Sequence, residues 1–257
     1  MRADQLLVER SLASTRSQAQ RLIKAGVRWL GPKGWQKIAK NGEELPADAQ
    51  LELQASDETK WVSRAGLKLE GALAHCGLDV SGTLCLDVGQ STGGFTEVLL
   101  ATGAKKVVGV DVGHGQLHPK LREHPQVNAF EGLNARGLTR SALKGALSSR
   151  FKGFDLIVGD LSFIPLPLVL PALVKLLAPS GTLLMLVKPQ FELQPKDIGK
   201  GGLVKDAASY AEVETKLRAA AAELGLRVVD WFDSAIVGGD GNHEFFIRAM
   251  SGTGSND

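Results

Sequence analysis

Aromatic side chains are scarce in this chain. Phe, Trp and Tyr together make up 5% of its 257 residues, and there is a single tyrosine. Hydrophobic residues nevertheless account for 44%, which is normal for a globular protein and argues against disorder. The composition therefore predicts an aliphatic core, either in one large domain or in a medium-sized domain beside a small one.

Cysteine is also rare, with Cys76 and Cys85 as its two occurrences. Both stand in apolar contexts and they do not form a CxxC pair, so a disulfide framework or a zinc site is not expected. A reducing cytoplasm is the compartment that this usage favours.

Long apolar runs are missing too. The best candidate, residues 161–174, is uncharged over 14 residues but contains Pro165, Pro167 and Pro171, and a membrane helix needs about 20 residues. The charged start, Met1-Arg2-Ala3-Asp4, does not look like a secretory signal. We therefore expect no membrane span and no secretion.

Positive charge is concentrated at one end of the chain. Residues 1–42 hold nine lysines and arginines against two acids, a net charge of +7, whereas the remainder holds 21 bases and 26 acids, a net charge of −5. This asymmetry indicates an N-terminal module that binds a polyanion.

The first 53 residues predict a small α+β module. Helices are expected over 3–8 and 15–25, the second capped by Ser14 or Thr15 and ended by Gly26. Short strands are expected near 26–30 and 51–53, with a turn at 31–34. The basic side chains of the second helix leave an apolar face for packing and a cationic face for phosphate.

A glycine-rich turn organises the rest of the chain. Residues 84–95 read Leu-Cys-Leu-Asp-Val-Gly-Gln-Ser-Thr-Gly-Gly-Phe, typical of the first strand of an open α/β sheet where it meets a ligand. The spacing lacks the GxGxxG of a dinucleotide site. The D-x-G-x-x-x-G-G arrangement better suits the amino-acid end of S-adenosylmethionine.

A second strand, 106–111, ends in Asp111, where an acid commonly binds the ribose hydroxyls of a nucleoside. Further strands are expected at 127–130, 154–159, 182–187, 226–236 and 244–250, with helices at 63–75 (capped by Ser63), 167–177 and 207–224. Strand and helix patterns alternate, which predicts a Rossmann-like, mostly parallel, doubly wound sheet. Leu67, Leu69, Ala72 and Leu73 are expected to face inward on the 63–75 helix.

Four polar residues stand at the ends of these elements: Lys68, Asp160, Lys188 and Glu244. The topology is expected to gather the first three around one crevice. A basic, glycine-rich loop with Lys196, Lys200 and Lys205 follows Lys188, either as a mobile lid or as a solvated connection. His114 and His118 have helical ligand spacing but no third ligand nearby, so no metal is expected.

The N-terminal pattern, carried by residues 6–10, 15–19 and 23–27, resembles the small RNA-binding domain named after the fourth small-subunit ribosomal protein. The resemblance implies two helices on a small sheet with a basic face for structured RNA. It also implies RNA-binding roles for basic residues of this module and two further cations: Arg2, Arg10, Arg16, Arg21, Lys24, Arg28, Arg64 and Lys200.

The whole chain, from Arg2 to about Met250, resembles the TlyA (haemolysin-A-type) family of rRNA cytidine-2′-O-methyltransferases. Six segments carry this resemblance: 63–69, 87–96, 159–164, 186–192, 199–202 and 241–245. The sequence departs from the family pattern at Gln90, where alanine is usual, at His118-Pro119 and at Gly132. The expected division is a basic RNA-binding domain over 1–57, a linker over 58–62, an FtsJ-like methyltransferase domain over 63–250 and a flexible tail over 251–257.

The resemblance implies methyl transfer from S-adenosylmethionine to a ribose 2′-hydroxyl of ribosomal RNA. Lys68, Asp160, Lys188 and Glu244 match the Lys-Asp-Lys-Glu set of FtsJ-like enzymes, with Lys188 as the candidate general base. The sequence does not assign which lysine is neutral. The expected cofactor-binding residues are Asp87, Gly89, Ser91, Thr92, Gly93, Gly94, Phe95, Asp111, Asn134 and Asp160.

Two other functions remain open at this stage. A non-catalytic RNA-binding assembly factor would keep the basic module around a vestigial site, although the intact tetrad argues against it. A secreted cytolysin, suggested by the family's older name, is disfavoured because no signal, span or strongly amphipathic membrane helix is present. The target nucleotide, the ribosomal subunit and the oligomeric state are not encoded in any motif found here.

Overall fold

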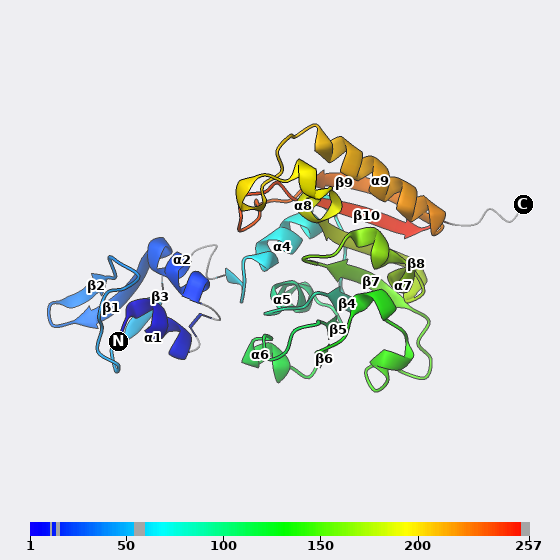
Figure 1. The fold of residues 1–257 in the computed structure, drawn as a ribbon. Helices are drawn as coiled ribbons and strands as arrows, with labels where there is room; N and C mark the ends of the chain where they lie inside the picture. Colours follow the sequence, from blue (N-terminus) through cyan, green and yellow to red (C-terminus); the bar gives the residue numbers. More distant parts are fainter. Residues whose placement is uncertain (11, 14–15, 54–59, 253–257) are drawn as a thin grey trace, which may run out of the picture.

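The computed structural model describes residues 1–10, 12–13, 16–53 and 60–252. In Figure 1 a small N-terminal unit, blue, stands beside a larger unit built on one twisted sheet. The expected cap at Ser14 or Thr15, residues 58 and 59 of the expected linker, and residues 253–257 of the tail lie outside the described residues.

The N-terminal unit packs two helices on three strands. Helices α1 (Ala3–Glu9) and α2 (Arg16–Gly26) cover a sheet of order β2-β1-β3, formed by β1 (Val27–Gly31), β2 (Gly34–Lys37) and β3 (Leu51–Leu53). Gly26 has φ +136°, so it ends α2 as expected. Strand β2 was not expected from the sequence; it pairs antiparallel with β1 across the predicted turn.

The larger unit contains a mixed seven-stranded sheet of order β6-β5-β4-β7-β8-β10-β9. Its strands are β4 (Leu84–Val88), β5 (Lys106–Val110), β6 (Val127–Phe130), β7 (Phe154–Gly159), β8 (Leu177–Val187), β9 (Leu226–Asp233) and β10 (Phe245–Ser251). Strands β4 to β8 pair in parallel, and β10 runs antiparallel to both of its neighbours. The Rossmann-like fold class expected from the sequence is confirmed, with one antiparallel strand near the edge.

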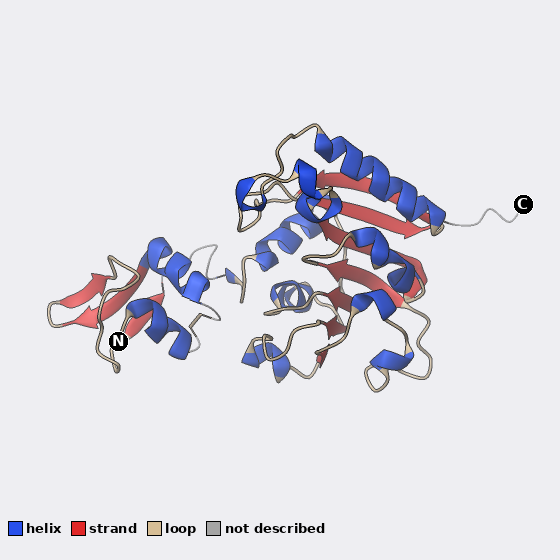
Figure 2. Cartoon of the chain, in the orientation of Figure 1, coloured by secondary structure: helices blue, strands red, loops and turns tan. Residues whose placement is uncertain are grey.

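Helices cover both faces of this sheet (Figure 2). Helices α4 (Ala65–Cys76) and α5 (Gly94–Ala101) pack on one face, and α7 (Leu170–Val174) and α9 (Ser209–Glu223) pack on the other. Two aliphatic cores result, one on each face. Short elements complete the unit: α6 (Pro119–Arg122), α8 (Pro189–Glu192), η1 (Ala135–Gly137), η2 (Ser141–Leu143), η3 (Leu166–Leu168), η4 (Pro195–Asp197) and η5 (Lys200–Gly202).

Three local expectations are wrong. The helix expected over 167–177 is divided into η3 and α7, and its last residue, Leu177, already belongs to β8, because the prolines at 167 and 171 each remove a backbone donor. Ser63 does not cap α4: the cap position is Arg64, which makes no side-chain capping bond. Leu67 is half-buried and joins neither core, whereas Leu69, Ala72 and Leu73 face inward as expected.

The chain crosses from one half of the sheet to the other between β4 and β7. After β4 the chain builds β5 and β6 on one side, then returns to place β7 and β8 on the other. The carboxyl ends of the strands at such a switch point border a crevice that binds ligands. Because β10 is antiparallel, its amino end lies at this same edge.

Candidate active site

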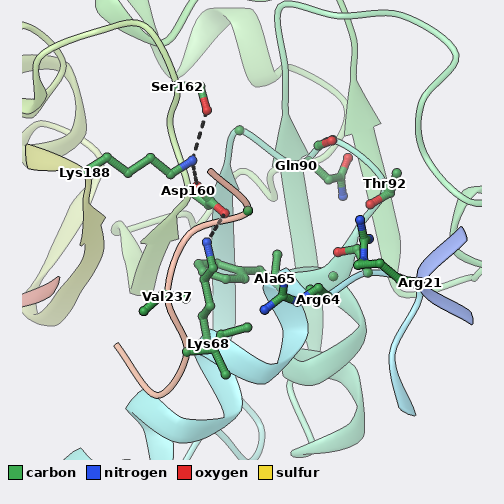
Figure 3. A pocket seen from close by; sticks show the side chains of 17 residues that line it. Arg21, Arg64, Ala65, Lys68, Gln90, Thr92, Asp160, Ser162, Lys188 and Val237 are labelled. Carbon is green, nitrogen blue, oxygen red and sulfur yellow. Dashed lines mark hydrogen bonds and ion pairs between the residues drawn. The ribbon is translucent and has the colours of Figure 1, made fainter. Parts of the chain in front are cut away.

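The four residues of the expected tetrad come together at this edge (Figure 3). The Lys68 ammonium lies 2.5 Å from a Glu244 carboxylate oxygen and 4.0 Å from Asp160. The Lys188 ammonium lies 2.5 Å from Asp160 and donates to the Ser162 hydroxyl at 3.0 Å. Asp160 therefore lies between the two lysines, and the sequence-based expectation that Lys68, Asp160 and Lys188 share one crevice is met by the geometry.

Strand register explains why Glu244 joins them. Phe245 of β10 is paired with Val187 of β8, so the residues immediately outside this pair, Glu244 and Lys188, reach the same edge from opposite chain directions. Asp160 follows β7 directly, and Lys68 projects from α4 on the adjoining face. Four segments far apart in sequence thus supply one cluster.

Burial sets the electrostatics of the cluster. Glu244 is 4% exposed and Lys68 is 7% exposed. Loss of hydration raises the pKa of Glu244, an effect opposed by the adjacent Lys68 cation. Two carboxylates and two lysines nearly balance in charge, which is the condition under which such a group of ions tolerates burial.

A cavity of about 340 Å³ opens on this cluster. We call it the tetrad cavity. Lys68, Asp160 and Lys188 line it together with the glycine turn of β4 and with Arg64. Arg21 of the N-terminal unit also lines it, so both units contribute to its wall.

A second cavity of about 620 Å³ adjoins the first, and we call it the Asp111 cavity. Gly89, Ser91, Asp160 and Ser162 line both cavities. Asp111 and Asn134 line only the second, together with apolar side chains such as Leu133 and Leu168. A polar cavity next to a more apolar one suits a ligand with a charged end and a planar, weakly polar end.

The glycine turn is shaped by close approach of the backbone. Gly89 has φ +82°, and a Cβ there would lie 2.6 Å from the Asp160 carbonyl oxygen. A Cβ on Gly94, the first residue of α5, would lie 2.2 Å from the Ser63 hydroxyl. Ser91 is a non-glycine residue at φ +47°, a strained conformation that is characteristic of functional turns.

The candidate cofactor-binding residues occupy three positions around this turn. Gly89, Ser91, Thr92, Gly94 and Phe95 line the tetrad cavity, and Gly93 caps α5. The Asp111 carboxylate accepts the backbone N–H groups of Ser91 and Gly113, both at 2.7 Å, and the Asn134 side chain accepts from Arg136. Asp87 lines neither cavity and lies beneath the turn.

Asp87 belongs to a buried hydrogen-bond chain. The Gln90 amide donates to the Thr96 hydroxyl at 2.9 Å, and that hydroxyl donates to Asp87 Oδ2 at 2.7 Å. Asp87 Oδ1 has no hydrogen-bond partner among the described residues, and burial raises the pKa of this carboxyl to about 7. Gly109 makes room for Gln90, since a Cβ there would lie 2.0 Å from the Gln90 amide.

The site fits a positively charged, adenosine-like group. The orphaned Asp87 oxygen provides negative polarity below the turn, and the turn requires its glycines because a Cβ on Gly89 or Gly94 would collide with Asp160 or Ser63. No group of three histidine, cysteine or acidic side chains that could hold a metal exists in the described part of the chain. His118 instead accepts the backbone N–H of Lys120 and caps α6.

The candidate RNA-binding residues fall into two groups. Arg2 and Arg16 pair with the buried Asp4, Arg10 donates to the carbonyls of Ala47 and Ala49, and Arg28 pairs with Glu52 at 3.5 Å. These four arginines stabilise the fold of the N-terminal unit and also contribute to its positive charge. Arg21, Lys24, Arg64 and Lys200 make up the second group; the first three line cavities or grooves, and Lys200 lies in η5.

Three polar residues around the site were missed by the sequence interpretation. Glu192 accepts the Leu166 backbone N–H at 2.5 Å, Asn242 bonds to Val204 and Gly202, and Gln18 donates to the Val62 carbonyl across the two units. Each acts on the backbone of a distant segment, which no local pattern reveals. The signal available was the place of Glu192 and Asn242 in the motifs at 186–192 and 241–245, and of Gln18 in the N-terminal segment 15–19.

Comparison with known proteins agrees with this architecture. The FtsJ-like methyltransferase family model matches residues 61–250, and the S4 domain model matches residues 1–26. The fold and the tetrad thus place the larger unit in the class of FtsJ-like methyltransferases. None of the helices in the described ranges is long and apolar enough to cross a membrane.

The relatives narrow this class. The 16S/23S rRNA (cytidine-2′-O)-methyltransferase TlyA of Mycobacterium tuberculosis is 42% identical over 264 residues, spanning 100% of this chain and 94% of the relative. Hemolysin A of Brachyspira hyodysenteriae is 34% identical, spanning 96% of this chain and 99% of the relative. The chain belongs to the TlyA family of rRNA cytidine-2′-O-methyltransferases, with an N-terminal S4 domain and an FtsJ-like methyltransferase domain.

A solved structure supports the same assignment. A protein of Streptococcus thermophilus that carries a hemolysin designation superposes with a TM-score of 0.75 at 38% sequence identity, covering 98% of this chain and 88% of that chain. Both units of the present fold therefore have a counterpart of known structure.

Proposed function

We propose that this protein transfers the methyl group of S-adenosylmethionine to the ribose 2′-hydroxyl of a cytidine in ribosomal RNA. The single observation that carries the proposal is the Lys68-Asp160-Lys188-Glu244 cluster, which borders a cavity shared with the glycine turn. The family suggests the substrate class, and an activity on ribosomal RNA favours a cytoplasmic location.

The two cavities divide the ligand between them. We assign the amino-acid end of S-adenosylmethionine to the turn of Gly89, Ser91, Thr92, Gly93 and Gly94. The adenosine end is assigned to the Asp111 cavity, where Asp111 and Asn134 supply polar contacts. When bound, the cofactor supplies an electrophilic methyl group on a sulfonium centre. Asp87 and Asp160 add negative charge near the expected position of that cation, which favours its binding.

Lys188 is our candidate for the residue that accepts the 2′-hydroxyl proton. Both lysines line the tetrad cavity, but the Lys188 amine pairs with one carboxylate, Asp160, and the Ser162 hydroxyl, whereas the Lys68 amine lies between two carboxylates, Glu244 and Asp160. With bound S-adenosylmethionine as the methyl donor, the Lys188 amine would accept the 2′-hydroxyl proton as the methyl group is transferred to that oxygen, and would then release the proton to solvent. Asp160 fixes the amine, and holding hydroxyl and methyl group in line supplies much of the acceleration.

The decisive experiment measures incorporation of labelled methyl groups into purified ribosomal subunits that lack the modification, followed by mapping of the methylated ribose. We expect Lys188→Ala to abolish incorporation while calorimetry still detects cofactor binding. Normal turnover by this variant would remove Lys188 from the mechanism. Absence of incorporation by the wild-type protein, with RNA binding intact, would favour the assembly-factor hypothesis instead.

A further inference from the structure

A basic groove of about 670 Å³ crosses the N-terminal unit beside α2. Its charged side chains are Arg21, Lys24, Lys37 and Lys40, and no acidic residue is among the described residues that line it. A groove whose described charged side chains are all cationic suits the phosphate backbone of a nucleic acid.

Arg21 is shared between this groove and the tetrad cavity, since it lines both. Arg21 therefore borders both the groove and the cavity whose wall also contains Lys188 and Asp160. Figure 3 shows the Arg21 side chain extending from α2 toward the cavity, on the side of Thr92 and Arg64.

The helix α2 presents these groups through its periodicity. Arg21 and Lys24 are three residues apart and so lie on neighbouring positions of one helix face. Gln18, three residues before Arg21, donates its amide to the Val62 carbonyl of the larger unit at 3.0 Å, in a buried contact. Ala19, Leu22 and Ile23 bury the opposite side of α2 in the core of the N-terminal unit. The docked helix thus holds Arg21 at the junction of the two units.

We propose that the basic groove and the tetrad cavity form one continuous RNA track, in which Arg21 is a positioning residue that binds a phosphate next to the target ribose. This inference rests on the proposed function. A ribose that enters the tetrad cavity carries phosphates on its 3′ and 5′ oxygens, within one nucleotide of the reacting hydroxyl. A cation on the wall of the same cavity meets one of these phosphates rather than a remote part of the RNA.

Arginine suits this role because its planar guanidinium donates two parallel hydrogen bonds to a phosphate. Such a contact fixes the sugar as well as attracting the chain, so it contributes to the maximal rate and not only to affinity. Lys24, Lys37 and Lys40, which line the groove alone, contribute to affinity through counterion release. The two kinds of cation are therefore separable by kinetics.

The experiment compares single-turnover methyl transfer by the full-length protein at saturating S-adenosylmethionine, with the concentration of ribosomal subunits varied. We expect Arg21→Ala to raise the half-saturating subunit concentration severalfold and also to lower the maximal rate about tenfold. Lys40→Ala should act on the half-saturating concentration, with a far smaller loss of maximal rate. Arg21→Lys should recover part of the maximal rate. Arg218→Ala is the charge-matched control, because Arg218 pairs with Glu214 on α9 and lines neither cavity.

Two outcomes overturn the proposal. If Arg21→Ala lowers the maximal rate no more than Lys40→Ala does, Arg21 does not position the target ribose and the RNA contacts are confined to the groove. If Arg21→Ala weakens S-adenosylmethionine binding as strongly as it lowers the rate, or if Arg21→Lys recovers nothing, Arg21 acts through contact between the units instead.

Salt dependence separates this inference from the proposed function. Should the wild-type protein bind subunits without methylating them, the proposed function fails but the track is still tested. Removal of Arg21 must then reduce the slope of log affinity against log salt by about one, as removal of Lys40 should. A slope unchanged by Arg21→Ala contradicts the track in that case also.

Discussion

The buried carboxyl of Asp87 in the larger unit has a raised pKa. It is 1% exposed, and burial raises its pKa to about 7, with the charge of Asp160 adding to the effect and the Thr96 hydroxyl opposing it. The carboxyl of an unfolded chain titrates near pH 3.9. Between about pH 4 and pH 7 the unfolded state therefore loses a proton that the folded state keeps, and stability falls as pH rises through this window.

The first prediction follows from this sign. Asp87→Asn cannot titrate, so its free energy of unfolding relative to the wild type should rise from pH 4 to pH 7, by up to roughly 4 kcal/mol for three pKa units. Urea unfolding at a series of pH values measures the difference. Asp79→Asn is the control, because a backbone hydrogen bond from Ser81 lowers the pKa of that exposed carboxyl and gives the opposite slope. A flat difference curve for Asp87→Asn would contradict the raised pKa.

Sequence reasoning recovers the residues that end strands and fails for those that join segments. Asp160 and Lys188 follow apolar runs, and their meeting follows from the topology of parallel strands. Glu192 and Asn242 act on the backbones of Leu166 and Val204, which are 26 and 38 residues away in sequence. No periodicity encodes such distances, so these contacts become visible only in three dimensions.

At the scale of elements, Glu192 joins the segment after β7 to the segment after β8. Its carboxylate accepts the Leu166 N–H at 2.5 Å, and the Lys216 ammonium of α9 donates to its carbonyl at 2.7 Å and to its carboxylate at 3.2 Å. Loss of hydration raises the pKa of Glu192. Asp160 precedes the first segment and Lys188 precedes the second. The buried Glu192 side chain therefore supports both residues of the Lys188–Asp160 ion pair.

We predict a graded series at this position. Glu192→Ala leaves the Leu166 N–H without its acceptor and should cost about 1–3 kcal/mol of stability, together with a severalfold loss of methyl-transfer rate. Glu192→Gln retains a carbonyl for that N–H and should lose less. Lys216→Met removes the ion pair and the hydrogen bond to the Glu192 carbonyl but leaves the Leu166 contact in place, so it serves as the matched control. Unfolding and single-turnover measurements check the order; equal losses in all three variants would show that the ion pair, not the Leu166 contact, holds the segments.

Asn242 performs a similar task for the basic, glycine-rich loop. Its side chain accepts the Val204 N–H at 3.0 Å and donates to the Gly202 carbonyl at 3.0 Å and to Asp240 at 2.8 Å. Gln190, just after Lys188, also donates to Asp240, at 3.1 Å. The loop with Lys200 is thus tied to the segment that leads into Glu244.

Breaking this tie should release the loop. For Asn242→Ala we predict about tenfold faster tryptic cleavage at Lys196, Lys200 or Lys205, since losing one buried hydrogen-bonding side chain costs about 1–3 kcal/mol. The methyl-transfer rate should fall with it. Asn128→Ala, on the edge strand β6, provides a control that lines neither cavity. Cleavage at the wild-type rate would mean that Asp240 and Gln190 hold the loop without Asn242.

The ends of strands are predicted correctly where local sequence determines them and incorrectly where contacts with distant residues do. Strands β6 and β7 coincide with the expected ranges because each is a mainly apolar segment, with one polar residue at its second position, bounded by polar or glycine residues. Strand β8 begins at Leu177 rather than at 182 and passes through Pro179 and Gly181. Its extra residues pair across a register shift with Phe154, a tertiary contact that overrides the local turn signal.

At the scale of the whole molecule, the two units differ in how burial and neighbouring charges shift the pKa values of their buried acids. In the N-terminal unit the Asp4 side chain is fully buried and is bonded by Arg2, Arg16 and Gln20. The Arg2 hydrogen bond is the largest cause that lowers the pKa of Asp4 well below its usual value. In the larger unit, burial raises the pKa values of Asp87, Glu192 and Glu244.

These opposite pKa shifts predict that acidification moves the unfolding transitions of the two units apart in temperature. Asp4 contributes stability that is fully present above about pH 4 and is lost as pH falls below that value, because its folded-state pKa is depressed. Asp87 stabilises the larger unit as pH falls from 7 toward 4, and the raised pKa values of Glu192 and Glu244 act in the same direction. Calorimetry between pH 7 and pH 3 should therefore resolve a lower-temperature transition for the N-terminal unit that moves away from the main one.

Asp4→Asn identifies that transition. The variant should lose about 3 kcal/mol at neutral pH, since Arg2 and Arg16 are left without their buried partner, and its lower transition should no longer shift as pH falls from 4 to 3. Arg218→Ala, which removes an exposed ion pair on α9, should leave both transitions in place. A single transition would show that the two units unfold together, and a transition that shifts identically with pH in Asp4→Asn and the wild type would contradict the lowered pKa of Asp4.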